Sequence, residues 1–384
     1  MRIAFIAPDS LSIVIFCSTF SRVLEETGEH KIFTICDVDQ FQEELELLPG
    51  QHFYVQMHRY SNLLRDAVYF LSLFRLFHQN NFDVVVTFTT KPNIYAVIAA
   101  RLAGVGKVVM AVRGLGRTFS KPNTLKEVVL HNTVKILYRL SSLTCQKVWF
   151  TNKYDKQYFL SQNMVNEKKI LMTKNAVDVS KWSPSNISNE RLSLLRAELK
   201  ISENNIVILM IARLVWSKGI REFVEAASIL SLQNPNLKFL LVAPHEENSL
   251  DAVPISYVRD AQKNESFKWL GFRKDIFDLC ALCDLAVLPS YYKEGGYPRA
   301  LLEPMALGKP VIAADTKDCR APVLDGENGF LVPPRDVAKL VESIAEICSD
   351  KKMRERFGER SLSLILEEYD DREVVMKILS EIND

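Results

Sequence analysis

The sequence predicts an α/β protein built from two Rossmann-like domains that face each other across a cleft. Two observations predict this fold. Short apolar and β-branched runs alternate with helical stretches along the whole chain, which is typical of parallel strands joined by crossover helices. The chain also has 384 residues, enough for two or three domains at about 150 residues each. Because the alternation occurs once in each half of the chain, we expect two domains.

The first half contains six runs that predict the strands of one parallel sheet. They are RIAFIA (2–7), KIFTIC (31–36), DVVVTF (83–88), KVVMAV (107–112), KVWFTN (147–152) and KILMTK (169–174). The first run is short and ends against Pro8 and Asp9. This is atypical of a secretory signal and favours a buried first strand.

The second half repeats the pattern with six more runs. They are NIVILMIA (205–212), LKFLLVA (237–243), FKWLGF (267–272), LAVLPS (285–290), KPVIAA (309–314) and FLVP (330–333). Between the halves, the segment 181–203 carries Pro, Ser and Asn turn signals in WSPSNISNE, which indicate a join. We therefore expect a first domain of residues 1–184, completed by a C-terminal helix at 365–384, and a second domain of residues 185–364.

The composition argues against several classes of protein. Hydrophobic residues make up 48% and charged residues 25% of the chain, as in folded globular proteins. No uncharged apolar run reaches the roughly 18 residues needed to cross a bilayer, so we expect no membrane span. The seven cysteines are odd in number and scattered, which indicates reduced thiols of the cytoplasm. The CxxC pair Cys280 and Cys283 is interpreted as two buried thiols rather than a zinc or redox site.

Charge is concentrated in one segment although the net charge is only +1. Residues 107–174 contain thirteen Lys or Arg against three acids, a local charge of +10. Such a density attracts phosphates or an anionic membrane surface. The alternative is the solvated face of a long helix. We expect no nucleic-acid partner.

Five segments with unusual polar residues follow predicted strands. Ligands of open parallel sheets bind beyond the carboxyl ends of the strands, so these segments are the expected sites. They are PDSLS, TTKPN and RGLGR in the first half, and RLVWSKG and YYKEGGYPRALLE in the second. The first-half segments contribute Ser10, Lys91 and Arg113, which we predict to contact substrate.

The segment RLVWSKG places Arg213 and Lys218 between a buried strand and the helix that opens after Gly219. Two cations at a helix N-terminus favour a diphosphate, because free backbone N–H groups and the helix dipole add to their charge. The alternative is that Arg213 pairs with a local acid and Lys218 lies in solvent. The spacing differs from that of an ATP-binding P-loop.

Glu294 and Glu303 flank a glycine-rich turn in YYKEGGYPRALLE. Gly295 and Gly296 let backbone N–H groups approach a polar ligand closely. A carboxylate in the helix that follows can accept hydrogen bonds from sugar or ribose hydroxyls, and Glu303 fits that role. The alternative is a capped surface helix with two ordinary acids.

Together with KNAVDVSKWSP, WLGFRKDIFDLCALCDLAVLPS and DGENGFLVPP, these segments resemble the family 4 retaining glycosyltransferases of GT-B fold. The resemblance covers nearly the whole chain. It implies that the first domain binds the acceptor and that the second binds a nucleotide-sugar donor. Arg213 and Lys218 would hold the donor diphosphate, and Glu303 would bind the donor ribose.

The resemblance implies further contacts around the donor. Glu294 and the turn of Gly295 and Gly296 would face the transferred sugar, so the expected catalytic residues are Arg213, Lys218 and Glu294. The other expected substrate contacts are Tyr297, Leu302, Phe272 and Arg273, the last two against the base. Eight residues separate Glu294 from Glu303, where the family usually has seven, so this turn contains an insertion.

The pieces KPNIYAVIAARLAG, RGLGRTFS and IARLVWSKGIREFVEAA most resemble bacterial members that extend undecaprenyl-diphosphate-linked sugars for surface polysaccharides or glycoproteins. This implies a UDP-sugar donor, a lipid-linked acceptor, and a cytoplasmic protein held on the inner face of the cell membrane. The basic segment 107–174 suits docking on anionic lipid heads. The segment YSNLLRDAVYFLSLFRLF fits the same surface or a core helix.

The family mechanism implies retention by same-face attack, in which the leaving UDP phosphate takes the acceptor proton. Two cations can neutralise the leaving diphosphate, so we expect no metal or other cofactor. The pair Asp37 and Asp39 in CDVDQ matches a metal-binding DxD of another fold, and we discount it because it lies far in sequence from the expected phosphate site.

The sequence leaves open three alternatives to a glycosyltransferase with a lipid-linked acceptor. A UDP-sugar epimerase can share the same twofold architecture. A glycosyltransferase with a soluble acceptor would need no membrane contact. The third is a non-catalytic protein that binds a nucleotide or recruits enzymes to the membrane. The transferred sugar depends on a few pocket contacts and does not follow from the sequence.

Overall fold

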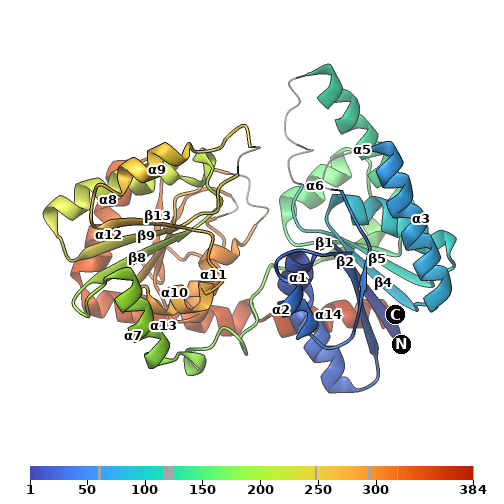
Figure 1. The fold of residues 1–384 in the computed structure, drawn as a ribbon, viewed down its shortest axis with the longest axis horizontal. Coiled ribbons are helices and arrows are strands. Elements are labelled where there is room, and N and C mark those ends of the chain that lie inside the picture. Colours follow the sequence, from blue (N-terminus) through green and yellow to red (C-terminus); the bar gives the residue numbers. More distant parts are fainter. Residues whose placement is uncertain are drawn as a thin grey trace. The chain divides into compact units, whose positions relative to one another are not determined.

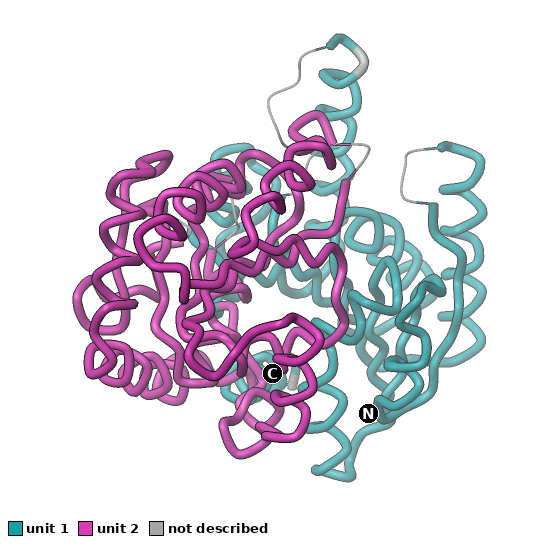
Figure 2. Tube along the Cα trace, turned by 60° about the vertical axis from the view of Figure 1, so that its left-hand side comes forward, with its two compact units in different colours: residues 1–174, 372–384 teal, residues 175–371 magenta. Residues whose placement is uncertain are grey.

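The computed structural model describes residues 1–58, 62–115, 119, 124–246, 249–292, 296–317 and 319–383, without the side chains of residues 126 and 383. The chain divides into two compact units (Figures 1 and 2). Unit 1 contains residues 1–174 and 372–384, and unit 2 contains residues 175–371.

The boundary between the units lies before Asn175 rather than at the expected 184/185. Backbone hydrogen bonds explain the shift: Val177 N–H donates to the Tyr369 carbonyl at 2.9 Å, and Asp371 N–H donates to the Val177 carbonyl at 3.0 Å. Trp182 is buried against Phe277, with ring centroids 5.5 Å apart. The turn signals around Trp182 therefore lead into a helix of unit 2. The returning C-terminal segment begins at 372 rather than 365.

Unit 1 is built on a seven-stranded sheet in the order β3-β2-β1-β4-β5-β6-β7, and every neighbouring pair is parallel. The strands are β1 (Arg2–Asp9), β2 (Lys31–Asp37), β3 (Gln51–Tyr54), β4 (Val84–Phe88), β5 (Lys107–Val112), β6 (Lys147–Phe150) and β7 (Ile170–Met172). Six of them were predicted. β3 was not, because its four residues, QHFY, lie half exposed at the sheet edge and form no apolar run.

Helices cover both faces of this sheet and enclose two hydrophobic cores. They are α1 (Ser10–Thr27), α2 (Gln42–Glu46), α3 (Leu63–Asn80), the π-helix η1 (Pro92–Ala96), α4 (Val97–Leu102), α5 (Leu125–Thr144), α6 (Lys153–Ser161), the short η3 (Glu167–Lys169) and α14 (Asp371–Asn383). One core holds residues of α3 to α6, and the other holds residues of α1, α2 and α14.

The C-terminal helix α14 completes unit 1. Its Val375 and Ile378 are fully buried with α1 in the same core. At its end, the Glu381 carboxylate lies 2.6 Å from the Lys147 ammonium, and the Lys107 ammonium donates to the Ile382 carbonyl at 2.5 Å. The last helix of the chain therefore packs on the first sheet, as expected from the sequence.

Unit 2 is built on a six-stranded parallel sheet in the order β10-β9-β8-β11-β12-β13. The strands are β8 (Ile206–Ile211), β9 (Leu237–Val242), β10 (Phe267–Gly271), β11 (Leu285–Leu288), β12 (Val311–Ala314) and β13 (Gly329–Val332). The helices are η4 (Pro184–Asn186), α7 (Asn189–Leu199), η5 (Trp216–Lys218), α8 (Ile220–Gln233), α9 (Ile255–Ala261), α10 (Ile276–Leu282), α11 (Arg299–Ala306), α12 (Val337–Ser349) and α13 (Lys351–Glu368). All six strands were predicted.

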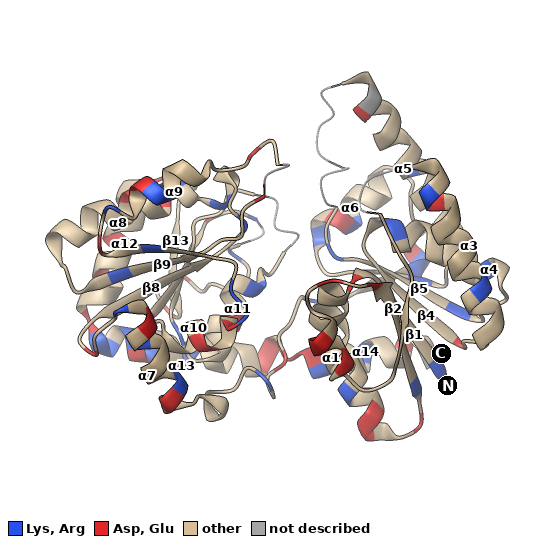
Figure 3. Cartoon of the chain, in the orientation of Figure 1, with Lys and Arg blue, Asp and Glu red and all other residues tan. Residues whose placement is uncertain are grey.

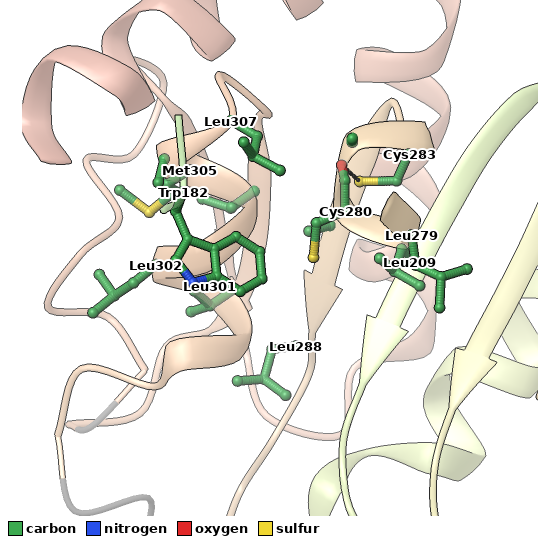
Figure 4. Packing of buried hydrophobic residues seen from close by; sticks show 14 of the residues in the cluster. Trp182, Leu209, Leu279, Cys280, Cys283, Leu288, Leu301, Leu302, Met305 and Leu307 are labelled. Carbon is green, nitrogen blue, oxygen red and sulfur yellow. Dashed lines mark hydrogen bonds between the residues drawn. The ribbon is translucent and has the colours of Figure 1, made fainter. Parts of the chain in front are cut away.

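The cysteines of the CxxC segment lie inside this unit (Figure 4). Cys280 and Cys283 are buried among leucines, and the Cys283 thiol donates to the Cys280 carbonyl at 3.3 Å. Burial raises the pKa of Cys283 to about 12. The two thiols therefore pack as small apolar groups, and the prediction that both are buried is confirmed.

The strand order reverses once in each sheet, between β1 and β4 in unit 1 and between β8 and β11 in unit 2. Ligands of doubly wound sheets bind at such switch points, beyond the carboxyl ends of the strands. Four of the five polar segments singled out in the sequence lie at the carboxyl ends of β1, β4, β8 and β11. In the part of the chain that the structure describes, no helix is both long and apolar enough to cross a bilayer.

Candidate functional site

The switch point of unit 2 is formed by the loops that leave β8 and β11. The first loop carries Arg213, then the short helix η5, and then Gly219, from which α8 begins. Gly219 has φ +82°, and a Cβ there would lie 2.4 Å from the Pro289 carbonyl oxygen. Only glycine lets the two loops pass this closely without a rearrangement.

Ser217 makes two hydrogen bonds to the loop after β11 and two to Asp251 in the loop after β9. Its carbonyl accepts from Tyr291 N–H at 2.9 Å and from the Ser290 hydroxyl at 3.4 Å. Its own N–H donates to Asp251 Oδ2 at 2.9 Å, and its hydroxyl donates to the same oxygen. Ser217 lies between Arg213 and Lys218 in sequence, so the network fixes the backbone that carries both cations.

Arg213 and Lys218 approach the same aromatic ring. The Arg213 guanidinium carbon lies 4.8 Å and the Lys218 ammonium 5.1 Å from the centroid of Tyr292. Arg213 also pairs with Glu246, with Nη1 3.1 Å from Oε2. Lys218 is only 9% exposed, so the alternative that places it in solvent is wrong. The structure brings the two predicted cations together beside the start of a helix, where anions bind favourably.

The glycine-rich turn after Tyr292 is described from Gly296 onward, so Glu294 and Gly295 lie outside the described residues. Gly296 has φ +81° and Tyr297 has φ +48°. A left-handed tyrosine costs about 1–3 kcal/mol and is typical of functional sites. The Tyr297 ring packs 5.5 Å from Tyr369, and its carbonyl accepts from Asn175 Nδ2 at 3.0 Å.

Glu303 and Leu302 are adjacent in α11 but have different surroundings. Glu303 is mostly buried, and its Oε1 accepts from Arg299 Nε at 2.8 Å. The Leu302 side chain is fully buried in the core with Trp182 and Leu301 (Figure 4), and its N–H donates to the Pro298 carbonyl at 3.2 Å. The side chain packs in the core and the N–H group is bonded within the helix. The prediction that the Leu302 side chain contacts substrate is therefore wrong.

Phe272 and Arg273 follow the edge strand β10, which β9 separates from β8. Phe272 is exposed. The Arg273 guanidinium lies 2.5 Å from Asp275 and 2.6 Å from Glu198. Hydrogen bonds to Asp275 and then Glu198 raise the pKa of Arg273. If Arg273 contacts the base, its guanidinium must do so while it also pairs with Asp275 and Glu198.

In unit 1, two of the predicted contacts are engaged in the fold. Ser10 is fully buried at the start of α1, and its hydroxyl donates to the Asp37 carbonyl at 3.3 Å. A substrate contact by its side chain is therefore wrong for this structure. The Lys91 ammonium lies 2.6 Å from Asp66 Oδ1 and 2.6 Å from the His58 carbonyl oxygen.

Arg113 is the predicted residue of unit 1 that rests on aromatic rings. It follows β5, and its guanidinium carbon lies 4.7 Å from the centroid of Phe16 and 5.3 Å from that of Trp149. The face of an aromatic ring attracts a guanidinium, so these two rings help to position Arg113. Its contact with substrate stays a prediction.

The carboxylates of CDVDQ have structural roles. Asp37 accepts backbone hydrogen bonds from Val38 and Met57, and Asp39 accepts from Leu11 and Phe41. Among the described residues, no group of three or more His, Cys, Asp or Glu side chains is arranged to hold a metal ion.

Figure 3 marks the Lys and Arg residues along the chain. Some of those in the basic segment 107–174 form contacts within unit 1. Lys169 donates to the Ser142, Leu143 and Cys145 carbonyls at the end of α5, and Lys147 pairs with Glu381. Apolar side chains are nevertheless exposed nearby. The most exposed of them on α5 are Leu125, Val129, Ile136 and Leu143, and the most exposed on α3 are Leu63, Leu64 and Val68.

Sequence reasoning missed four residues of the unit 2 site. They are Ser217, Glu246, Asp251 and Tyr292. Tyr292 lies in a segment that the sequence already singled out, so its aromatic character beside two cations was an available signal. Glu246 and Asp251 reach the site from the loop after β9, and no local pattern indicates which strand loops meet.

Two family models match most of the chain. Residues 3–152 match the model described as Glycosyl transferase 4-like, and residues 193–363 match the model described as Glycosyl transferases group 1. The first match lies in unit 1 and the second in unit 2. Arg213, Lys218 and Glu303 all fall within the group 1 region.

Similar proteins match this chain over most of its length. The N,N'-diacetylbacillosaminyl-diphospho-undecaprenol alpha-1,3-N-acetylgalactosaminyltransferase of Campylobacter jejuni is 26% identical over 99% of this chain and 97% of its own. The UDP-Gal:alpha-D-GlcNAc-diphosphoundecaprenol alpha-1,3-galactosyltransferase of Escherichia coli is 28% identical over 76% and 72%. The crystal structure of a glycosyltransferase from Rickettsia africae superposes with a TM-score of 0.80, at 19% identity, over 99% and 97% of the two chains. This confirms the predicted fold of two Rossmann-like domains.

Proposed function

We propose that this chain, which belongs to the group 1 and 4-like glycosyltransferases, transfers a hexose or N-acetylhexosamine from a UDP-sugar to an undecaprenyl-diphosphate-linked sugar. The observation that carries the proposal is the convergence of Arg213 and Lys218 on Tyr292 at the switch point of unit 2. This patch has the charge and the position that a donor diphosphate requires.

The donor assignment has two supports. First, one relative is named for using UDP-Gal. Second, Glu303 lies on α11, the helix after the loop that contains Tyr292, where a carboxylate can accept hydrogen bonds from ribose hydroxyls. Two cations neutralise much of the charge of a leaving diphosphate. We therefore propose a transfer that needs no metal, and chelation by EDTA tests this directly: activity that requires added Mg²⁺ would contradict it.

The acceptor assignment rests on both relatives, each named for an acceptor that carries a diphosphate on undecaprenol. In unit 1, we propose Arg113, which stacks on Phe16 and Trp149, as the contact for such an anion. The exposed leucines of α3 and α5, together with the basic character of 107–174, support docking on an anionic membrane surface. The site of action would then be the inner face of the cell membrane.

The proposed mechanism is same-face substitution with retention. The bond between the sugar anomeric carbon and the UDP oxygen breaks, the acceptor hydroxyl oxygen forms the new bond, and its proton passes to the leaving phosphate. Arg213 and Lys218 stabilise the charge that develops on that phosphate. Glu294 stays a predicted contact to the transferred sugar.

A screen of UDP-sugars with an undecaprenyl-diphosphate-sugar acceptor in detergent tests the proposal. Released UDP and the acceptor mass are the readouts, with the Arg213→Ala, Lys218→Ala double variant as control. We expect a mass gain of one sugar with one donor, and none with the control. Sugar isomerisation without acceptor would indicate the epimerase, transfer only to soluble glycans would indicate a soluble acceptor, and donor binding without transfer or hydrolysis would indicate a non-catalytic protein.

A further inference from the structure

The Tyr292 ring lies close to both Arg213 and Lys218, the two cations of the proposed diphosphate site. Arg213 and Lys218 come from opposite ends of the loop after β8, yet both lie about 5 Å from the centroid of this one ring. The face of an aromatic ring carries negative electrostatic potential, and each cation held over it gains about 0.5–2 kcal/mol. A shared ring therefore offsets part of the repulsion between two cations held close together.

The Tyr292 backbone is fixed relative to the cations. Its N–H donates to the Ser290 hydroxyl at 3.2 Å, and that hydroxyl donates to the Ser217 carbonyl at 3.4 Å. The Tyr291 N–H donates to the same carbonyl, and the Arg335 guanidinium lies 4.3 Å from the Tyr291 ring. The ring is thus carried by backbone that is hydrogen-bonded to Ser217, the residue next to Lys218.

We propose that Tyr292 is a positioning residue for the donor diphosphate: its ring holds Arg213 and Lys218 at one place, so that both cations meet the same diphosphate. The proposal rests on the proposed function, in which these two cations bind that group. Loss of the ring would let the cations separate. The diphosphate would then bind only one of them at a time. The tyrosine hydroxyl has no part in this role.

The distinguishing experiment compares Tyr292→Phe, which keeps the ring, with Tyr292→Leu, which removes it. Kd of UDP is measured by calorimetry, and KM and kcat are measured for the UDP-sugar. We expect Tyr292→Phe to stay within about twofold of the parent, and Tyr292→Leu to weaken UDP binding by about threefold to thirtyfold. KM should rise more than kcat falls. Tyr54→Leu, the same change at an exposed position of unit 1, serves as matched control.

Competition by fragments separates positioning from general damage. Tyr292→Leu should lose affinity for inorganic pyrophosphate but keep that for uridine. Equal loss of both, or equal loss of UDP affinity in Tyr292→Phe and Tyr292→Leu, would overturn the role of the ring, as would UDP binding unchanged in both. If Arg213→Ala and Lys218→Ala also bind UDP like the parent, the proposed diphosphate site fails, which is a separate result.

Discussion

Arg213 and Glu246 form an ion pair across the carboxyl edge of the unit 2 sheet, with Nη1 3.1 Å from Oε2. Arg213 follows β8 and Glu246 follows β9, so the pair joins neighbouring loops. The carboxylate contributes a negative charge at the place where we propose that the donor diphosphate binds. We therefore expect Glu246 to oppose diphosphate binding, although it pairs with Arg213, the residue that would attract the diphosphate.

We expect Glu246→Gln to tighten UDP binding. Glutamine keeps a hydrogen-bond acceptor for Arg213 but removes the competing charge. Because both side chains are partly exposed, the gain is limited to about twofold to fivefold in Kd, as for a partly screened pair. Calorimetry at low and high salt measures it, and the gain should shrink at high salt. Weaker binding would instead show that the Glu246 charge is needed to orient Arg213.

Arg213→Ala and Lys218→Ala should each lower kcat/KM at least about tenfold, which corresponds to about 1.4 kcal/mol of lost transition-state stabilisation. Steady-state kinetics with the donor varied provides the measurement. Lys263→Ala is a matched control in the same unit, because this lysine is exposed and pairs with Asp260 within its own turn. Parent-like kinetics in folded Arg213 and Lys218 variants would remove these residues from the site.

Asp66→Asn should destabilise unit 1. The Asp66 carboxylate lies 2.6 Å from the Lys91 ammonium, and both side chains are largely buried. Removing one charge leaves Lys91 without its buried counterion, which we expect to lower the free energy of unfolding by about 2 kcal/mol or more. Urea unfolding measures the loss, and hydrogen exchange in α3 and η1 locates it. Asp260→Asn, which breaks an exposed pair, should cost less than about 1 kcal/mol; equal losses would argue against the structural role of the buried pair.

Leu302→Ala tests whether this side chain serves the core or the donor site. The side chain is fully buried in the unit 2 core, so its truncation should cost about 2–5 kcal/mol of stability. UDP binding by the folded protein should stay within about twofold. Leu232→Ala, at an exposed leucine of α8, should change neither quantity. A stable Leu302→Ala protein with weakened UDP binding would restore the residue to the site.

The strands and the two cations could be predicted from the sequence because their signals are local. The runs VVVTF and IVILMI are apolar except for one threonine, as is typical of buried parallel strands. Arg213 and Lys218 follow such a run directly. By contrast, β3 has no apolar run, and the Asp66–Lys91 and Arg213–Glu246 pairs join residues from different strand loops and helices. Those contacts depend on strand order, which periodicity does not specify.

The same reason explains the errors at Ser10 and Leu302. Each residue has the expected type and follows the expected strand. The direction of its side chain, however, depends on how the adjoining helix packs. Ser10 turns toward β2 and Leu302 turns into the core. The sequence thus identifies the loops of a site more reliably than the side chains that face a ligand.

The exposed leucines at the start of α3 provide the last prediction, which concerns the membrane. Leu63 is 89% and Leu64 is 81% exposed, although both belong to a helix whose other face is buried in the core. We expect the double variant Leu63→Ser, Leu64→Ser to lower binding to vesicles containing phosphatidylglycerol by roughly thirtyfold, because each leucine loses roughly 1 kcal/mol of apolar burial. Vesicle sedimentation measures this, with Leu232→Ser as control because that leucine is equally exposed but lies in unit 2. Unchanged binding in the double variant, or an equal loss in the control, would assign docking to another surface. If the parent protein binds neutral and anionic vesicles equally, the basic segment 107–174 has no part in docking.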